Sequence, residues 1–397
     1  MASQYRRRSL MLNTIAKVAQ GNPTIITDSS SRRLQKLNIY GQSSQDGTPS
    51  VENPIPIISK EVSEIKVTGA NLIEFPFYSG TKVVKGITFT VNDDQSITIN
   101  GTNDGTGDSV IEINMNIRFK KGDAISTGLL SDKDDANVYV NAFYIGGIGT
   151  NSKKENIIVD NDSKNYDILL SVKLGATIDN VTVKFMRNYG PTLLPYEPYK
   201  SQSITLSEPI TLRGIPVSSG GNITIDGQQY ISDVITEKDG VIGVERNIID
   251  LSASEDIVFT QTSDRPNRTR ASNAFNIPTS IKSGDKEALS THFVWKAWSQ
   301  GNNNKEWLFS VNLRSLYISP PAKEVNYTKE EIESLVNGEW AKIKNDVKFY
   351  AQLSEPTFDP LPDEIQTQYK ALKSYYPNTV INTGCWNEVT YSAKRGG

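Results

Sequence analysis

The sequence has only one cysteine and one histidine among its 397 residues. A single thiol, that of Cys385, excludes an internal disulfide framework and a zinc site built on several thiolates. The lone imidazole, that of His292, leaves little room for general-base or metal chemistry, because such sites usually need histidine, often several. A chain of this length should divide into two or three domains, each large enough for its own core.

Long apolar runs are also missing. No stretch approaches the roughly 20 apolar residues that a membrane-spanning helix requires, so we expect no membrane insertion. Arg6, Arg7 and Arg8 could begin a signal peptide, but no continuous apolar segment follows them, and we therefore expect no export signal. The net charge of −3 is too small to indicate nucleic acid as a partner of the whole chain. With 37% apolar and 22% charged residues, the composition is that of a globular protein.

The first 36 residues are distinctly basic. Three of their apolar side chains recur at i, i+4 and i+7, the spacing of one helical face, and Gly21-Asn22-Pro23 would end such a helix. A basic segment with a single amphipathic stretch cannot form its own core. Residues 1–36 are therefore predicted to be an anchor, helical or extended, that docks on an acidic neighbour in an assembly; a solvated tail is the competing interpretation. The predicted anchoring residues are Arg6, Arg7, Arg8, Met11, Ile15 and Val18.

Residues 37–68 are predicted to form a proline-rich β strap or linker, with one strand at Leu37–Tyr40. Pro54 and Pro56 hold the backbone extended and lack the N–H that a central strand would donate. Such a segment runs along an edge or joins two modules. The strap would hand the chain to the next module at Gly69.

Residues 69–200 show the period of two that is typical of half-buried strands. In the segment GITFTV the apolar residues Ile87, Phe89 and Val91 alternate with polar ones, and the Asn-Asp-Asp that follows can make a tight turn. Further runs of this kind follow, with polar turns between them and no long helical period. The pattern predicts a β-sandwich over residues 69–200.

The rest of the chain is predicted to contain a β connector over residues 201–250 and a second β-rich domain over residues 251–397. Two short helices are expected in the second domain. One, near 329–337, starts at a Thr-Lys-Glu-Glu capping box; the other, near 362–375, starts at a proline that is followed by acidic residues. The whole chain is therefore expected to be mainly β.

All five tryptophans lie in the C-terminal domain. A flat aromatic ring can stack on the apolar face of a sugar, and neighbouring amides can hold the hydroxyl groups. Two tryptophans stand beside a polar loop, which predicts a saccharide site there. The competing interpretation is that each tryptophan packs in the core of the domain. The predicted saccharide-binding residues are Trp295, Trp298, Gln300, Asn302 and Asn303.

No other pattern predicts chemistry. The acidic clusters lack the spacing of an EF-hand and are expected to be solvated loops; were a structural Ca²⁺ to bind, Asp132 and Asp134 would be the expected ligands. A nucleophile elbow GxSxG is absent, so a Ser-His-Asp triad around His292 is not expected. A pair of glycosidase carboxylates cannot be located from sequence. We therefore predict no catalytic residue, no metal site and no cofactor.

Several segments, among them YGQSSQDGTPSVENPIPI, GITFTVNDDQSITINGT and PYEPYK, resemble tail and baseplate proteins from phages and prophages of Gram-positive bacteria. Gln95 stands where glycine is usual in the hairpin phrase of that family. The resemblance also favours an insertion, in which residues 69–200 form a module within a larger scaffold and Leu37–Tyr40 pairs with Ser203–Leu206. The resembling segments are YGQSSQDGTPSVENPIPI, GANLI, GITFTVNDDQSITINGT, PYEPYK, LRGIP, IDGQQYISD and EIQTQYKALKSYYPNTVI.

The resemblance implies a fold and a role. Residues 69–200 would be a jelly-roll, carbohydrate-binding-like module, and the chain would be a structural part of a tail tip, baseplate or fibre that helps attach the particle to its host. Its partners would be other virion proteins, reached through the N-terminal arm, and a host cell-wall glycan or surface receptor. By analogy with fibres it would be a homo-oligomer, most simply a trimer, with weak sites summed by repetition. It would be made in the host cytoplasm and reside in the virion.

Three other roles remain open from sequence. The same modules could build a capsid decoration or head fibre, which differs only in its place on the particle. A glycan-degrading tailspike would need a carboxylate pair that sequence cannot locate. A secreted carbohydrate-binding module would need the export signal that we do not expect.

Overall fold

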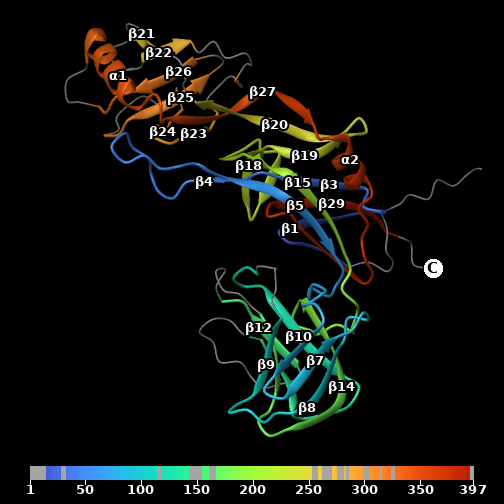
Figure 1. The fold of residues 1–397 in the computed structure, drawn as a ribbon. Coiled ribbons are helices and arrows are strands. Elements are labelled where there is room, and N and C mark those ends of the chain that lie inside the picture. Colours follow the sequence, from blue (N-terminus) through green and yellow to red (C-terminus); the bar gives the residue numbers. More distant parts are fainter. Residues whose placement is uncertain are drawn as a thin grey trace, which may run out of the picture.

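The protein is mainly β: its computed structural model has 53% strand, 8% helix and two helices, which confirms the expected fold class. The chain forms three units, which we call the sandwich unit, the central unit and the distal unit (Figure 1). Within the described residues no helix is both long and apolar enough to cross a membrane. The structure describes residues 15–27, 33–113, 119–142, 154–160, 167–252, 258–261, 271–274, 281–282, 286–297, 305–312, 315–322 and 327–393.

The sandwich unit consists of two antiparallel sheets that share one core. Phe89, Ile111 and Phe185 are buried in that core and come from both sheets, so the alternation seen in the sequence points one face of each strand inward. The six-stranded sheet contains, in order, β12 (Lys154–Ile158), β10 (Ala124–Ser131), β14 (Thr177–Tyr189), β8 (Ile97–Thr102), β7 (Ile87–Val91) and β6 (Thr81–Val84). The three-stranded sheet contains β11 (Val138–Ala142), β13 (Ile168–Val172) and β9 (Ser109–Ile113).

The central unit is built from strands of both chain ends and of the middle of the chain. Its two largest sheets enclose a core that includes Ile39, Val62 and Ile235. The seven-stranded sheet contains, in order, β1 (Ile15–Gly21), β29 (Trp386–Ala393), β3 (Lys36–Tyr40), β19 (Val234–Lys238), β20 (Val241–Ser252), β27 (Lys348–Pro360) and β23 (Leu289–Ser290). β23 pairs with the end of β27 that lies in the distal unit. The five-stranded sheet contains β15 (Ser201–Leu212), β5 (Ile58–Thr68), β28 (Asn378–Asn382) and β2 (Thr24–Thr27), with β4 (Ser43–Ser44) paired to β5.

Residues 201–250 are part of the central unit and not a separate connector. They supply β15, β19 and β20, together with a small sheet that packs Ile215 and Ile231 into a core of its own. That sheet contains β16 (Gly214–Val217), β18 (Gln228–Ser232) and β17 (Ile223–Ile225), in this order.

The described part of the N-terminal segment is extended, one of the two forms predicted for it, and contains no helix. β1 pairs with β29 along its whole length, from Ile15 opposite Ala393 to Gly21 opposite Asn387, and β2 pairs with β28. The prediction that Ile15 and Val18 share a helical face is therefore wrong. Both residues are β-branched, and pairing with a distant strand satisfies the backbone in a way that no local pattern could reveal. Val18 is 59% exposed, while Arg6, Arg7, Arg8 and Met11 lie outside the described residues.

The sandwich unit is inserted into the central unit, but not through the predicted strand pair. The chain leaves the central unit after β5 and returns at β15, and these two strands pair with Thr68 opposite Ser201. Leu37–Tyr40 pairs instead with β19 and β29, so the predicted pairing with Ser203–Leu206 is wrong. The sandwich unit extends from the lower side of the central unit in Figure 1.

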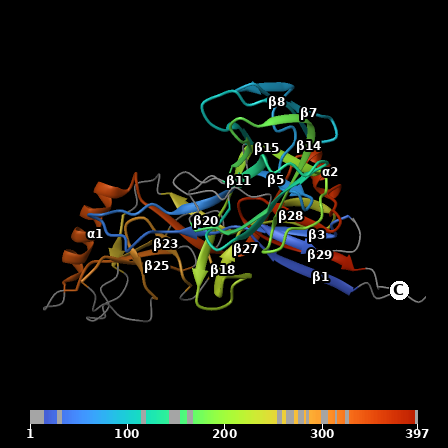
Figure 2. The same ribbon diagram turned by 90° about the horizontal axis from the view of Figure 1, so that it is seen from below.

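The distal unit is joined to the central unit by two long shared strands. β20 and β27 pair from Gly243–Pro360 in the central unit to Ser252–Lys348 in the distal unit. Its own sheet packs against α1 (Lys329–Ile343), and α1 lies at the opposite end of the molecule from β1 (Figure 2). That sheet contains β21 (Thr260–Gln261), β22 (Ala271–Ala274), β26 (Ser315–Ser319), β25 (Leu308–Asn312) and β24 (Val294–Trp295).

The two helices differ in length from the predictions. α1 begins at the predicted capping box, where the Thr328 hydroxyl accepts from Glu331 N–H, but it continues to Ile343 because Trp340 and Ile343 extend its buried stripe. α2 (Asp363–Lys370) ends earlier than predicted. The chain after it turns into an extended segment, in which Lys373 forms a β-bridge with Arg33.

Candidate functional sites at the joints between units

A buried asparagine joins the two segments through which the chain enters and leaves the sandwich unit. We call these segments, residues 69–73 and 195–200, the neck. Asn71, in the GANLI segment, donates from Nδ2 to the carbonyl oxygens of Phe185 and Glu197, both at 2.9 Å. Its Oδ1 accepts from the N–H groups of Ile73 at 3.2 Å and Arg187 at 3.3 Å. The side chain is only 3% exposed. One amide therefore links the incoming segment, strand β14 and the outgoing PYEPYK segment, with every donor and acceptor in use.

Gln95, at the tip of a hairpin, forms hydrogen bonds to the same PYEPYK segment. Its φ is +64°, in the left-handed region where glycine costs least. The side chain amide bonds both sides of one residue: Oε1 accepts from Tyr199 N–H at 2.5 Å and Nε2 donates to the Tyr199 carbonyl at 3.1 Å. The left-handed Gln95 thus completes the turn, and its side chain adds a contact between the sandwich unit and its neck.

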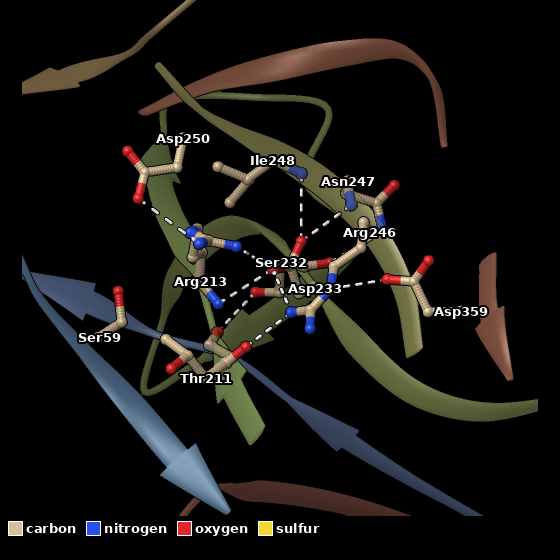
Figure 3. A network of polar contacts seen from close by, with 12 residues as sticks. Ser59, Thr211, Arg213, Ser232, Asp233, Arg246, Asn247, Ile248, Asp250 and Asp359 are labelled. Carbon is tan, nitrogen blue, oxygen red and sulfur yellow. Dashed lines mark hydrogen bonds and ion pairs between the residues drawn. The ribbon is translucent and has the colours of Figure 1, made fainter. Parts of the chain in front are cut away.

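A second joint lies where β20 bends toward the distal unit. The β20–β27 pairing shifts register between Arg246 and Ile248, which takes N–H groups out of the ladder. The fully buried carboxylate of Asp233 receives them: Oδ1 accepts from Asn247 N–H at 2.9 Å and from Ile248 N–H at 3.1 Å (Figure 3). Oδ2 accepts from Arg246 Nη1 at 3.1 Å. Burial raises the pKa of Asp233, and Arg246 and the backbone donors act against that rise.

Two arginines and two glycines complete this joint. Arg246 also donates to the Thr211 carbonyl at 2.6 Å, and Arg213 lies 3.8 Å from Asp233 and 3.5 Å from Asp250 (Figure 3). Gly41 and Gly214 lie back to back, because a Cβ on Gly214 would come within 2.4 Å of the Gly41 carbonyl oxygen. The YGQS, LRGIP and YISD segments therefore meet in one place.

The proline-rich run ties the distal unit to the central unit. Gln45 Nε2 donates to the carbonyls of Ile55 at 3.1 Å and Ser290 at 2.9 Å, and Ile55 N–H donates to the Thr291 carbonyl at 2.9 Å. Val51 packs against the distal core. The sequence predicted a strap that joins the N-terminal anchor to the sandwich module. These contacts instead join the run to the distal unit, and residues 58–68 of the predicted strap form β5 inside the five-stranded sheet.

An open groove of about 650 Å³ lies between the end of α2 and the neck of the sandwich unit. Three cations line it: Arg33, Lys370 and Lys373. Gln202 holds the backbone of Lys373 from both sides, since Nε2 donates to its carbonyl at 2.9 Å and Oε1 accepts from its N–H at 3.2 Å. Burial raises the pKa of the half-buried Tyr375, which lines the groove as well. Sequence reasoning missed this site because Arg33 comes from the opposite end of the chain.

Only one of the predicted saccharide-binding residues is within the described part of the chain. Trp295 is half-buried on β24, which pairs in parallel with β25, and it packs against the distal core. The other described tryptophans are also packed: Trp340 is 3% exposed, and Trp307 lies edge-on to Phe293. The saccharide site stays a prediction, because Trp298, Gln300, Asn302 and Asn303 lie outside the described residues.

The candidate calcium ligand that sequence favoured has a backbone role. Asp132 Oδ1 accepts from Thr182 N–H at 2.7 Å and closes a loop against β14. Asp134 interacts elsewhere in the structure. Within the part of the chain that the structure describes, no three histidine, cysteine, aspartate or glutamate side chains converge on one point.

The single histidine is buried as a neutral base. Thr291 Oγ1 accepts from Lys348 N–H at 2.9 Å and lies 2.8 Å from His292 Nδ1, so a hydrogen bond joins the hydroxyl to the ring. Burial lowers the pKa of His292, and Asp346 partly opposes this shift.

The unfolding free energy should therefore fall as the pH drops below the ordinary histidine pKa of about 6.5. The neutral ring is favoured in the folded state, so its stabilisation is complete above that value and is lost as the ring protonates, at up to about 1.4 kcal/mol per pH unit. Urea unfolding at pH 7.5, 6.5 and 5.5 would measure the slope, and His292→Gln should flatten it. Equal slopes in the two proteins would contradict this assignment.

The joints and the groove offer two kinds of chemistry. At the joints, amide, carboxylate and guanidinium side chains form hydrogen bonds that hold backbone segments together. The groove presents cations to solvent and can receive an anion. No protein-family model matches the chain, and no curated protein is significantly similar to it.

Proposed function

We propose that this chain is a structural component of a phage or phage-derived particle, in the tail tip, baseplate or fibre, where it contributes to host attachment by binding saccharide. The observation that carries the proposal is where the phage-like segments lie. Several of them contact one another at the neck and at the bend, where the units are joined.

The neck illustrates this relation. Asn71 of GANLI bonds to Glu197 of PYEPYK, and Gln95 of the hairpin segment bonds to Tyr199 of PYEPYK. In the C-terminal segment, Tyr369 donates its hydroxyl to the Leu37 carbonyl at 2.7 Å. Segments that are far apart in sequence and share a resemblance to one family are thus in mutual contact, which is what a family of modular scaffolds would require.

The bend supports the same role. Asp233, at the end of YISD, accepts hydrogen bonds from the bulge from which β20 continues into the distal unit. Gln45 of the strap bonds to Ser290 on β23, which pairs with β27. A protein that transmits load between a particle and a surface needs such fixed angles between its units. On the phage analogy, the sandwich unit is a jelly-roll module and the assembly is a homo-oligomer, most simply a trimer.

The test of the proposal is the place of the chain in purified particles. Particles produced by the strain that encodes the chain would be purified on a density gradient and labelled with antibodies to the distal unit. We expect label at the tail tip or baseplate. Label on the head would favour the decoration or head-fibre alternative, and particles without the chain would overturn the proposal.

The anchor can be tested separately by removing residues 1–14. This deletion takes away Arg6, Arg7, Arg8 and Met11 but spares β1, so the protein should melt as the full chain does. Incorporation into particles should fall by about tenfold or more, the loss expected from a few surface ion pairs of up to 1 kcal/mol each. A second variant keeps the segment and replaces its three arginines with glutamine, so that it isolates the contribution of their charge. Normal incorporation of both variants would show that the segment is not an anchor.

A further inference from the structure

We propose that the groove beside α2 binds an anionic polysaccharide through its phosphate or carboxylate groups. This would be a second binding site, for a different class of ligand from that of the tryptophan site. Only its biological purpose depends on the attachment role proposed above. Its chemistry is opposite to that of the predicted tryptophan site, which would hold uncharged sugar faces.

The charge in the groove is local and largely uncompensated. The chain as a whole has a net charge of −3, yet Arg33, Lys370 and Lys373 gather along one hollow. Among the residues that the structure describes, no carboxylate pairs with Arg33 or Lys373. Lys370 Nζ donates to the Gly240 carbonyl at 2.5 Å. Such a cluster lowers the cost of bringing in an anion.

An adjoining hollow extends the basic character. It shares Arg33 and Lys370 with the groove and adds Lys36, while Glu237 is the single acidic residue in its lining. The two hollows together hold four cations and one anion, so the surface remains positive by three charges.

The backbone under these cations is rigid, which favours binding because little has to be ordered. Arg33 and Lys373 form a β-bridge, and Leu34 N–H donates to the Leu372 carbonyl at 3.0 Å. Gln202 fixes the Lys373 backbone from β15, as described above. The guanidinium group of Arg33 can grip two oxygens of one anion, while each lysine acts as a point charge.

The shape and the aromatic residue favour a polysaccharide. The groove is open, so a polymer can pass along it. The half-buried ring of Tyr375 lines the same hollow and gives a face on which a sugar can pack. Single-stranded nucleic acid binds through successive stacking aromatics, and this groove offers one.

The groove also adjoins the neck of the sandwich unit. A Cβ on Gly69 would lie 3.8 Å from the Cβ atoms of both Lys200 and Tyr375, and Gly69 N–H donates to the Lys200 carbonyl at 2.9 Å. A polymer bound here would therefore contact the frame at the point where the sandwich unit departs.

The test measures binding of three polysaccharides and one mixed-sequence oligonucleotide to the purified full chain by isothermal titration calorimetry in 50 mM NaCl. Phosphomannan carries phosphate, polygalacturonate carries carboxylate and unmodified mannan is uncharged. We expect one or both of the charged polymers to bind, mannan not to bind through this site, and affinity to fall in 300 mM NaCl because salt screens exposed charges. Which charged polymer binds identifies the source of the anion.

Two variants decide whether the groove is responsible. Arg33→Gln combined with Lys373→Gln should weaken binding by about tenfold or more, the loss expected for two charge-assisted contacts. Lys329→Gln, an exposed lysine on the other helix, is the matched control and should stay within about twofold. Both substituted groove side chains are exposed, and circular dichroism would verify the fold.

Equal binding by the double variant, no binding of either charged polymer, or tighter binding of a mixed-sequence oligonucleotide would overturn the proposal. Since no particle is involved, this test can fail while the particle experiments succeed, and the reverse.

Discussion

Replacing Asp233 with alanine is expected to lower the free energy of unfolding by about 3–5 kcal/mol, the cost of breaking a buried ion pair by removing one partner. The carboxylate is fully buried and accepts from Asn247 N–H, Ile248 N–H and Arg246. Without it, two N–H groups at the β20 bulge and the N–H group of Arg213 would lose this acceptor, and the guanidinium group of Arg246 would lose its buried partner. Urea unfolding followed by tryptophan fluorescence would measure the loss, since the shared strands couple this joint to the distal unit.

Two further variants separate the buried pair from general charge effects. Asp359→Ala removes the other carboxylate that contacts Arg246, at 3.4 Å, but this carboxylate is 62% exposed. Its loss should cost at most about 1 kcal/mol. Asp233→Asn keeps the shape and one acceptor oxygen, so its cost should lie between the two. Equal effects of Asp233→Ala and Asp359→Ala would mean that the bend does not depend on this carboxylate.

The alternating strands were predictable because their signal is local. Ile87, Phe89 and Val91 face one core at a period of two, and the structure buries the first two completely. The capping box at Thr328 is equally local, since both of its hydrogen bonds lie within four residues. Such patterns depend only on residues that are close in the sequence. The mainly β fold and the start of α1 could therefore be predicted from the sequence alone.

The errors arose where the partner is distant. Ile15 and Val18 fit a helical face over three positions, but β29 pairs with them from the far end of the chain. In the same way nothing near Arg33 indicates that Lys373 will lie beside it. The role of Asp233 depends on a bulge that forms only when β20 and β27 pair. Such features come from long-range pairing, which single-sequence patterns do not encode.

The candidate sites also differ in whether they depend on local patterns or on long-range pairing. The extended run around Pro54 and Pro56 was predictable, because prolines exclude a central strand wherever they occur. Residues 58–68 of the predicted strap nevertheless form β5, a central strand of the five-stranded sheet. The resemblance of the GANLI and PYEPYK segments was visible, but not that Asn71 binds Glu197. The groove could not be found, since its cations join only after the two chain ends pair. Motifs therefore located the joints, and only the fold explained them.

Replacing Asn71 with alanine should cost about 3 kcal/mol or more, because four buried backbone groups lose their partner and each unsatisfied group costs about 1–3 kcal/mol before relaxation. Those groups are the carbonyls of Phe185 and Glu197 and the N–H groups of Ile73 and Arg187. The damage should concentrate at the neck. Hydrogen exchange followed by mass spectrometry should show the amides of Ile73 and Arg187 exchanging faster than in the unaltered protein.

Gln95 provides the matched control in the same joint, because it binds the outgoing segment from the surface. Gln95→Gly loses two hydrogen bonds to Tyr199, worth about 1 kcal/mol each, but relieves a left-handed backbone that costs about 1 kcal/mol or more. Its net effect should be small, whereas Gln95→Ala keeps the strain and should cost more. We therefore expect the order Asn71→Ala, then Gln95→Ala, then Gln95→Gly. An Asn71→Ala protein as stable as Gln95→Gly would mean that the neck is held by apolar packing such as that of Val380, which β28 contributes to the core of the sandwich unit.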